Sequence, residues 1–160
     1  MPEKILLGLG SNLGNRLKNL ESAIAALPAH IAVTGRSSVY ETPPWGYADQ
    51  NNFYNMVVEA ETEFSPPELL RELKAVEKKL GRTPSFKYGP REIDIDILLY
   101  GDSSISEADL TIPHPRIAER AFILVPMADL APDLKIPGLN RTVTELLQTL
   151  DTSGITRVNP

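Results

Sequence analysis

The chain has 160 residues, of which 42% are hydrophobic and 23% are charged, and its net charge is −5. These values describe one globular domain, so we expect a single domain over residues 1–160 and exclude disordered and fibrous classes. The absence of cysteine excludes disulfides and thiolate chemistry, and no apolar stretch approaches the roughly 20 residues of a membrane-spanning helix. We therefore expect a cytoplasmic protein without a membrane partner, and the negative charge argues against a general nucleic-acid binder.

Hydrophobic periodicity defines most of the elements that we expect. It predicts, in chain order, a strand at 4–9, a turn at 8–12, a helix at 14–27, strands at 31–40 and 53–62, a helix at 66–80 and a strand at 93–100. Gly35 suggests a bulge within its strand. Residues 43–52 carry two prolines, a glycine and two large aromatics without an apolar period, which predicts a long ordered loop.

The helix at 66–80 has the clearest local signals. Ser65 is a good N-cap, Glu68 completes a capping box, Pro66 suits the first helical position and Gly81 ends the helix. Further along, we expect a short hairpin or loop at 105–115, a helix at 121–130 interrupted near Pro126, and a last helix at 143–150 behind a second capping box.

The order strand, helix, strand, strand, helix, strand is the signature of a split βαβ unit. We therefore expect an α+β, ferredoxin-like fold. Its sheet should be mainly antiparallel, with helices packed on it in a three-layer α/β/α arrangement.

Two aspartates in the strand at 93–100 are the first candidates for chemistry. Side chains two apart share a face of a strand, so Asp94 and Asp96 project together, roughly 7 Å apart at the backbone. The opposite, core-facing side should hold Ile93, Ile95, Ile97 and Leu99. Paired carboxylates repel each other, and a divalent cation such as Mg²⁺ relieves that repulsion. The alternative is a solvated face of an edge strand.

A basic island precedes these aspartates. Residues 71–92 hold seven basic and three acidic side chains, so the segment carries +4 and the remainder of the chain −9. Arginine forks match phosphate oxygens, and phosphoryl transfer uses metals and arginines to neutralise charge. Arg82, Lys87 and Arg91 could therefore bind a polyphosphate. The alternatives are a solvated helix face and a simple ion pair between Arg91 and Asp94.

Other candidates lie in loops and at strand ends. GLGSN at 8–12 lacks the Walker A pattern, so we interpret it as a turn and helix cap. His114 lies between two prolines, before Arg116 and Arg120, where a phosphate contact is plausible and a structural role is the alternative. The sparse aromatics Trp45, Phe53 and Phe122 could stack on a flat heterocycle or belong to the core.

The motifs GSN, YETPPWG, FYN, YGPREIDIDILLYG and IPHPR, followed by ERAFIL, occur here in order. Together they resemble the 6-hydroxymethyl-7,8-dihydropterin pyrophosphokinases of folate synthesis over essentially the whole chain. This resemblance implies that a diphosphate is transferred from ATP to the pterin hydroxymethyl group and that AMP leaves. It also implies ATP and the pterin as partners, two Mg²⁺ ions as cofactors, no nucleic acid and a monomer.

The resemblance also implies roles for individual residues. The metal ligands would be Asp94 and Asp96, which with Arg82 and Arg91 form the catalytic group. The ATP-binding residues would be Lys74, Glu77, Arg82, Lys87, Arg91, Ile97, His114 and Arg120. The pterin-binding residues would be Thr42, Pro44, Trp45, Phe53, Asn55, Asp94 and Phe122. The loop at 82–92 would close over both substrates.

Two residues of that loop depart from the family pattern. Tyr88 stands where other members carry tryptophan, and Lys87 stands where an arginine is common, an exchange that changes bidentate contacts. Two rival functions remain at this point. One is a ferredoxin-like module that binds nucleotides or RNA, and the other is a different ATP-dependent transferase on the same fold.

Overall fold

The computed structural model describes residues 2–46, 48–82, 85–86 and 88–158. Its strands are β1 Glu3–Ser11, β2 Ile31–Arg36, β3 Tyr40–Thr42, β4 Phe53–Thr62, β5 Asp94–Tyr100, β6 Ile105–Glu107, β7 Leu110–Ile112 and β8 Thr156–Arg157. Its helices are α1 Arg16–Ala26, α2 Pro66–Lys79, α3 Ala121–Leu130 and α4 Val143–Leu147, with a 3-10 turn at Ile117–Glu119. No helix in this part of the chain is long and apolar enough to span a membrane.

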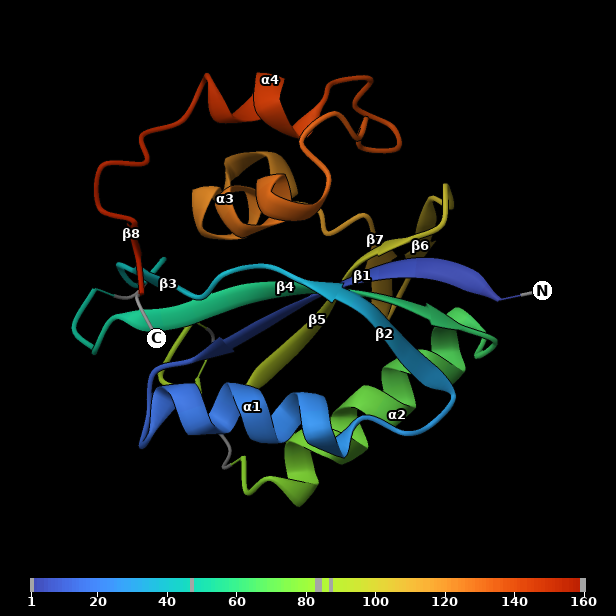
Figure 1. Cartoon of the computed structure of the whole chain (residues 1–160), viewed down its shortest axis with the longest axis horizontal. Coiled ribbons are helices and arrows are strands. Elements are labelled where there is room, and N and C mark those ends of the chain that lie inside the picture. The colour runs from blue at the N-terminus through green and yellow to red at the C-terminus, as the bar shows by residue number, and fades with distance from the viewer. Residues whose placement is uncertain (1, 47, 83–84, 87, 159–160) are drawn as a thin grey trace.

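The sheet has the expected ferredoxin-like connectivity. Its order is β5-β1-β4-β3-β8, β2 also pairs with β4, and every pairing is antiparallel. β1 therefore lies between β4 and β5, the two strands that helix α2 connects. β4 in turn lies between β1 on one side and β2 and β3 on the other. Helices α1 and α2 cover one face while α3 and α4 cover the other (Figure 1). The predicted three-layer α+β arrangement is confirmed.

Each face of the sheet has its own hydrophobic core. Ile5, Leu7 and Leu9 of β1 point toward α1 and α2, where they meet Leu20, Leu69 and Leu73. Leu6, Val57 and Leu124 belong to the core beneath α3. The alternation of side chains along β1 therefore assigns its residues to the two faces.

The predicted turn at 8–12 is wrong, because β1 continues through Ser11. Gly8 pairs with Val57 and Asp96, and Gly10 pairs with Asn55 and Asp94. Helix α1 begins only at Arg16, after the N-cap Asn15, whose side chain accepts a hydrogen bond from the Lys18 N–H at 3.1 Å. These glycines are therefore strand residues rather than turn or cap residues.

The predicted assignment of β5 side chains to the two faces of the sheet is wrong at the carboxyl end of the strand. The register with β1 shifts, so that Leu7 pairs with Ile97 but Leu6 pairs with Leu99. Leu98 is the extra residue of this bulge, and both Leu98 and Leu99 lie in the core beneath α3. A bulge re-aims the side chains that follow it, which is why Leu99 does not share a face with Ile97.

The remaining elements follow the sequence with three differences. The expected strand at 31–40 is split into β2 and β3, because the buried Ser37 bonds to Val57 in between. Helix α3 runs without interruption through Pro126, and α4 ends at Leu147 rather than at residue 150. The bulge near Gly35, the hairpin β6–β7 and both capping boxes are confirmed.

Candidate active site

Two cavities meet at the carboxylates of β5. The first, here called the aromatic cavity, measures about 270 Å³ and is lined by Trp45, Phe53, Tyr88 and Phe122 among others. The second, here called the charged cavity, measures about 380 Å³ and is lined by Lys74, Glu77, Arg82 and Asp109 among others. Both cavities share Asp94, Asp96 and His114. A group bound in one cavity can therefore meet a group bound in the other at these three side chains.

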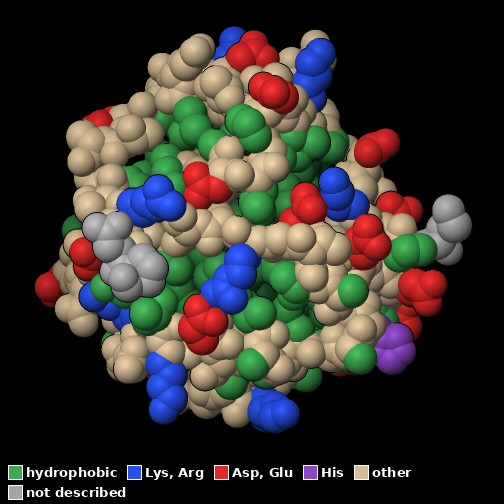
Figure 2. Space-filling view, in the orientation of Figure 1, with side chains coloured by type: hydrophobic (Ala, Val, Ile, Leu, Met, Phe, Trp, Pro, Cys, Tyr) green, Lys and Arg blue, Asp and Glu red, His purple; other side chains and the backbone are tan. Residues whose placement is uncertain are grey.

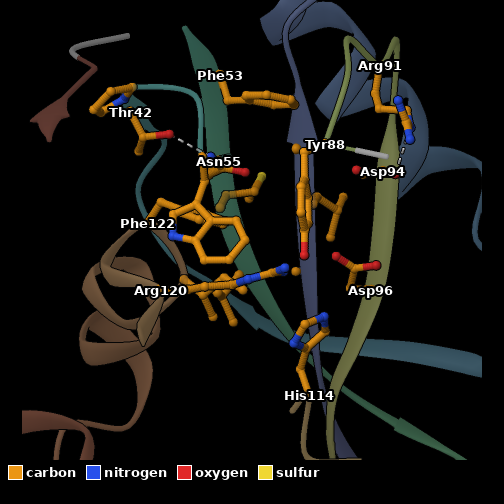
Figure 3. Close-up of a pocket in the computed structure, with 18 of the residues that line it drawn as sticks. Thr42, Phe53, Asn55, Tyr88, Arg91, Asp94, Asp96, His114, Arg120 and Phe122 are labelled. Carbon is orange, nitrogen blue, oxygen red and sulfur yellow. Dashed lines mark hydrogen bonds and ion pairs between the residues drawn. The ribbon is translucent and has the colours of Figure 1, made fainter. Parts of the chain in front are cut away.

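The floor of the aromatic cavity comes from three neighbouring strands. Asp94 and Asp96 project from β5, Gly10 and Gly8 lie opposite them on β1, and Asn55 follows on β4 (Figure 3). A Cβ added to Gly10 would lie 2.5 Å from Asn55 Oδ1. Glycine is therefore needed where the backbone passes beneath the carboxamide.

Asp94 is paired with arginine on its charged-cavity side. Arg82 Nη2 lies 3.2 Å from Asp94 Oδ1, and Arg82 Nη1 lies 2.6 Å from Glu77 Oε1. The second Glu77 oxygen accepts the Ile95 N–H at 2.8 Å. Burial raises the pKa of Glu77, against the opposing effects of these two bonds. Glu77 therefore ties α2 both to β5 and to the arginine that faces Asp94.

Asp96 differs from Asp94 in its surroundings. Burial, and then the neighbouring Asp94 carboxylate, raise the pKa of Asp96 to about 7. The guanidinium groups of Arg120 and Arg82 act in the opposite direction without cancelling this shift. The negative charge of the pair is therefore not fully compensated by the neighbouring arginines, as expected of carboxylates that bind a cation.

The Arg91 guanidinium donates hydrogen bonds to three carbonyls of its own loop. Nη1 donates to the Gly89 and Pro90 carbonyls and Nη2 donates to the Phe86 carbonyl, all at 2.9 to 3.0 Å. Its Nε lies 3.9 Å from Asp94 Oδ1 and has no hydrogen-bond partner within the described parts of the chain. The ion pair with Asp94 therefore exists, but it is longer than the pair between Asp94 and Arg82.

His114 and Arg120 also lie near the junction of the two cavities: His114 lines both cavities, and Arg120 lines the aromatic cavity. The N–H of Arg116 donates to His114 Nδ1 at 3.2 Å. Burial, together with Arg120 and Arg116, lowers the pKa of His114 to about 4, so the ring is neutral at pH 7. The guanidinium of Arg120 lies 4.7 Å from the centroid of the Trp45 ring, and the residue is 8% exposed. Its Nε has no hydrogen-bond partner among the residues that the structure describes.

The aromatic side chains surround one carboxamide. Asn55 Nδ2 donates to Thr42 Oγ1 at 2.8 Å, which fixes the orientation of the amide. Phe53, Trp45 and Phe122 line the same cavity, and Trp45 meets Tyr88 edge to face with 5.0 Å between ring centroids. The cavity therefore combines flat apolar surfaces with one oriented polar group.

Most of the residues singled out from the sequence come together here. Thr42, Trp45, Phe53, Asn55, Arg91, Arg120 and Phe122 line the aromatic cavity. Lys74, Glu77, Arg82 and Ile97 line the charged cavity. Pro44 lines neither, whereas its neighbour Pro43 lines the aromatic cavity, and Lys87 lies outside the described residues.

Sequence reasoning missed several lining residues. Gly8 and Gly10 were interpreted as a turn, and Leu70 and the tip and second strand of the β6–β7 hairpin were not singled out. The repeated glycines within an apolar strand were an available signal, because glycine in a strand often marks close approach of another group. Leu70 carried only the signal of a helix core.

Within the described residues, no group of three or more His, Cys, Asp or Glu side chains is placed to hold a metal. Among these residues, the carboxylates shared by the two cavities are those of Asp94 and Asp96. Mg²⁺ accepts such a set when substrate phosphates and water complete its octahedral coordination. Paired carboxylates, arginines and a divided cavity on a ferredoxin-like fold define the class: a small phosphotransferase.

The particular family follows from sequence comparison. The sequence profile of 7,8-dihydro-6-hydroxymethylpterin-pyrophosphokinase (HPPK) matches residues 6–132. The chain belongs to this family, and it is therefore a pyrophosphokinase of folate synthesis. This assignment favours the enzyme over the ferredoxin-like binding module. On the face shown in Figure 2, basic and acidic side chains are also interspersed rather than gathered by sign.

Named relatives support the assignment. The chain is 47% identical to the 2-amino-4-hydroxy-6-hydroxymethyldihydropteridine pyrophosphokinase of Methylorubrum extorquens, over 95% of this chain and 96% of the relative. It is 43% identical to the enzyme of that name from Aquifex aeolicus, over 88% of each. A mitochondrial folate synthesis bifunctional protein of Pisum sativum is 45% identical over 80% of this chain but only 25% of its own length.

Solved structures share the fold at lower identity. A Plasmodium falciparum HPPK-DHPS triple mutant with pteroate matches with a TM-score of 0.81 and 17% identity, over 100% of this chain. The same triple mutant with STZ-DHP gives a TM-score of 0.78 and 19% identity over 93% of this chain. Our chain spans less than half of those longer chains, 47% and 43% respectively. At this identity the likeness shows the fold alone.

Proposed function

We propose that this chain transfers diphosphate from ATP to the hydroxymethyl oxygen of 6-hydroxymethyl-7,8-dihydropterin and releases AMP. One observation carries this proposal: an aromatic cavity and a charged cavity meet at Asp94 and Asp96. The reaction needs a flat heterocycle and a polyphosphate side by side. From the family resemblance we also propose that the chain acts as a monomer.

The aromatic cavity suits the pterin. Phe53 and Phe122 offer apolar ring surfaces, and heterocycles stack favourably on such faces. Because Asn55 Nδ2 is committed to Thr42, its Oδ1 is the atom left to accept a hydrogen bond from a ring N–H. Trp45 and Pro43 would cover the ligand from the loop before β4.

The charged cavity suits ATP. Lys74, Arg82 and His114 line it beside the apolar side chains of Leu70, Ile97 and Leu110. The apolar surfaces could bind the adenine, while the cationic groups and the neutral His114 ring could bind ribose and phosphates. Arg120 and Arg91 reach the junction from the aromatic side. We assign Lys87 to the same group only from the family resemblance.

Asp94 and Asp96 would hold two Mg²⁺ ions together with the phosphates of ATP. Bound magnesium neutralises polyphosphate charge and orients the transferred group. The observation that favours this assignment is the pKa of Asp96, raised by burial and by Asp94 to about 7, because a nearby cation would stabilise the ionised form.

The protein's own residues would align the substrates, stabilise the developing charge and exclude water. Asp94 and Asp96 border both cavities, so they align the hydroxymethyl group with the polyphosphate. Arg82, held in place by Glu77 at 2.6 Å, presents its guanidinium to the charge that develops during transfer. The aromatic walls exclude water that would otherwise hydrolyse ATP.

Product analysis tests this function. Purified protein with ATP, Mg²⁺ and 6-hydroxymethyl-7,8-dihydropterin should form AMP and the pterin diphosphate in equal amounts. Anion-exchange chromatography measures both products. Without the pterin, AMP should not accumulate. Formation of ADP, or nucleotide turnover that is independent of the pterin, would rule out the proposed reaction.

Gly10→Ala is expected to weaken pterin binding specifically. The added Cβ would lie 2.5 Å from Asn55 Oδ1, so the carboxamide must leave its position beside Thr42. We expect the KM for the pterin to rise about tenfold, on the scale of losing one oriented hydrogen bond in a buried site. The KM for ATP should change little, because the charged cavity does not include Gly10 or Asn55.

Gly35→Ala is the matched control, because the nearest atom to a Cβ at Gly35 would be Leu130 Cδ2 at an ordinary van der Waals distance of 3.5 Å. Steady-state kinetics with each substrate varied in turn measures both constants. Equal pterin KM values for the two variants would contradict the role given to Asn55.

A further inference from the structure

The proposed function explains Gly10 of the GSN segment at 10–12 but not Asn12. Asn12 follows β1 and is 1% exposed. Its Oδ1 accepts the Arg91 N–H at 2.8 Å, and its own N–H donates to the Arg91 carbonyl at 3.0 Å. Its Nδ2 donates to Gln50 Oε1 at 2.9 Å and to the Asn51 carbonyl at 3.0 Å. One buried side chain thus joins two loops that are far apart in sequence.

Gln50 extends this connection to the aromatic cavity. Its Nε2 donates to the Tyr88 carbonyl at 2.7 Å. Tyr88 has a φ of 62°, a conformation that a bulky residue holds only when its surroundings enforce it. The Tyr88 ring lies edge to face with Trp45 and so close to Gly46 that a Cβ there would be 2.7 Å away. The position of Tyr88 therefore depends on the loop before β4.

Arg91 extends the connection to the carboxylates. Asn12 holds the backbone of Arg91 through both its N–H and its carbonyl. The Arg91 side chain in turn binds the carbonyls of Phe86, Gly89 and Pro90. Asp94 begins β5 three residues later. Displacing Asn12 would therefore free both the backbone that leads into β5 and the preceding loop whose carbonyls Arg91 binds.

We infer that Asn12 is a positioning residue that acts through Gln50 and Arg91 and couples the two loops that form walls of the aromatic cavity. The inference rests on the proposed function, because it gives those walls to the pterin. Asparagine suits the position since it carries a donor and an acceptor on one short side chain. Aspartate would lack the donor for Gln50 and Asn51, and alanine would lack both.

Gln50→Ala tests the coupling without touching the buried asparagine. Trp45 is the only tryptophan of the sequence, so its fluorescence reports the contact with Tyr88. We expect a changed Trp45 emission in the free protein and a kcat about tenfold lower, because small misplacements near reacting groups are costly. The KM for ATP should stay within about twofold, since Gln50 and Tyr88 do not line the charged cavity and Asn12 still binds the Arg91 backbone in this variant.

Asp49→Ala is the matched control, an exposed neighbour in the same loop. Equal emission and equal kcat for Gln50→Ala and Asp49→Ala would overturn the inference. If Asn12→Ala folds, its loss in kcat and that of Gln50→Ala should be less than additive in the double variant, because both remove one connection. Fully additive losses would overturn the coupling as well. If Asn12→Ala does not fold, the comparison of Gln50→Ala with Asp49→Ala decides.

The same experiment separates this inference from the proposed function. Wild-type protein that fails to form AMP from ATP and the pterin would refute the reaction, whereas the Trp45 emission of Gln50→Ala would still test the coupling. Wild-type protein that forms AMP, with Gln50→Ala behaving as Asp49→Ala, would refute the coupling alone.

Discussion

Asp96→Asn is expected to lower kcat for diphosphate transfer by about 10³-fold while the protein stays folded. Asparagine keeps the size of the side chain but removes one of the two charges that would hold magnesium at the junction of the cavities. The loss should appear at saturating ATP, pterin and Mg²⁺, measured by AMP formation. Asp102→Asn, an exposed aspartate just after β5, should leave kcat unchanged.

The same variant has a second, opposite signature in stability. The folded-state pKa of Asp96, about 7, lies above its ordinary value of 3.8, so ionisation destabilises the folded protein as pH rises from 4 to 7. Asparagine cannot ionise and escapes this effect. In metal-free buffer Asp96→Asn should therefore unfold at a higher temperature than the wild type at pH 8, and the difference should vanish near pH 4. A variant that is inactive and also less stable at pH 8 would indicate a structural role instead.

Arg82→Met is expected to reduce kcat by about 10²-fold or more and to destabilise the fold by about 2 kcal/mol. The rate falls because the guanidinium beside Asp94 is lost. The stability falls because Glu77 stays buried with its Ile95 bond but without its cation. Chemical denaturation and AMP formation measure the two effects separately.

Two companion variants sharpen that experiment. Arg82→Met combined with Glu77→Gln should recover much of the stability, since the unpaired buried carboxylate is gone, but none of the rate. Arg71→Met, an exposed arginine of α2, should change neither. If Arg82→Met lost stability but kept its rate, Arg82 would be a structural partner of Glu77 and not a catalytic group.

Local signals explain what could be predicted of the fold. The start of α2 follows from Ser65, Pro66 and Glu68, all within one turn, and the structure confirms it. The alternation of β4 depends only on its own residues, and its range matches the prediction. The bulge at Leu98 could not be predicted, because it depends on how β5 pairs with Leu6 and Leu7 of β1, more than 90 positions earlier in the chain.

The candidate site shows the same division. The shared face of Asp94 and Asp96 follows from strand geometry, and the cavities place both at the junction. The contacts of Asn12 could not be predicted, because its partners Gln50 and Arg91 lie 38 and 79 residues away. The left-handed backbone of Tyr88 likewise reflects packing against another loop rather than a turn signal of its own.

The sheet order has a consequence for solubility. β5 is an edge strand, and an edge with free N–H groups invites pairing with a strand of another molecule. At Ile95 the N–H is already bonded to the Glu77 carboxylate, so a side chain of α2 occupies the place that an added strand would take. The apolar strand that carries the aspartates is thereby guarded against edge-to-edge aggregation, although the carboxylates on its face remain accessible to substrates.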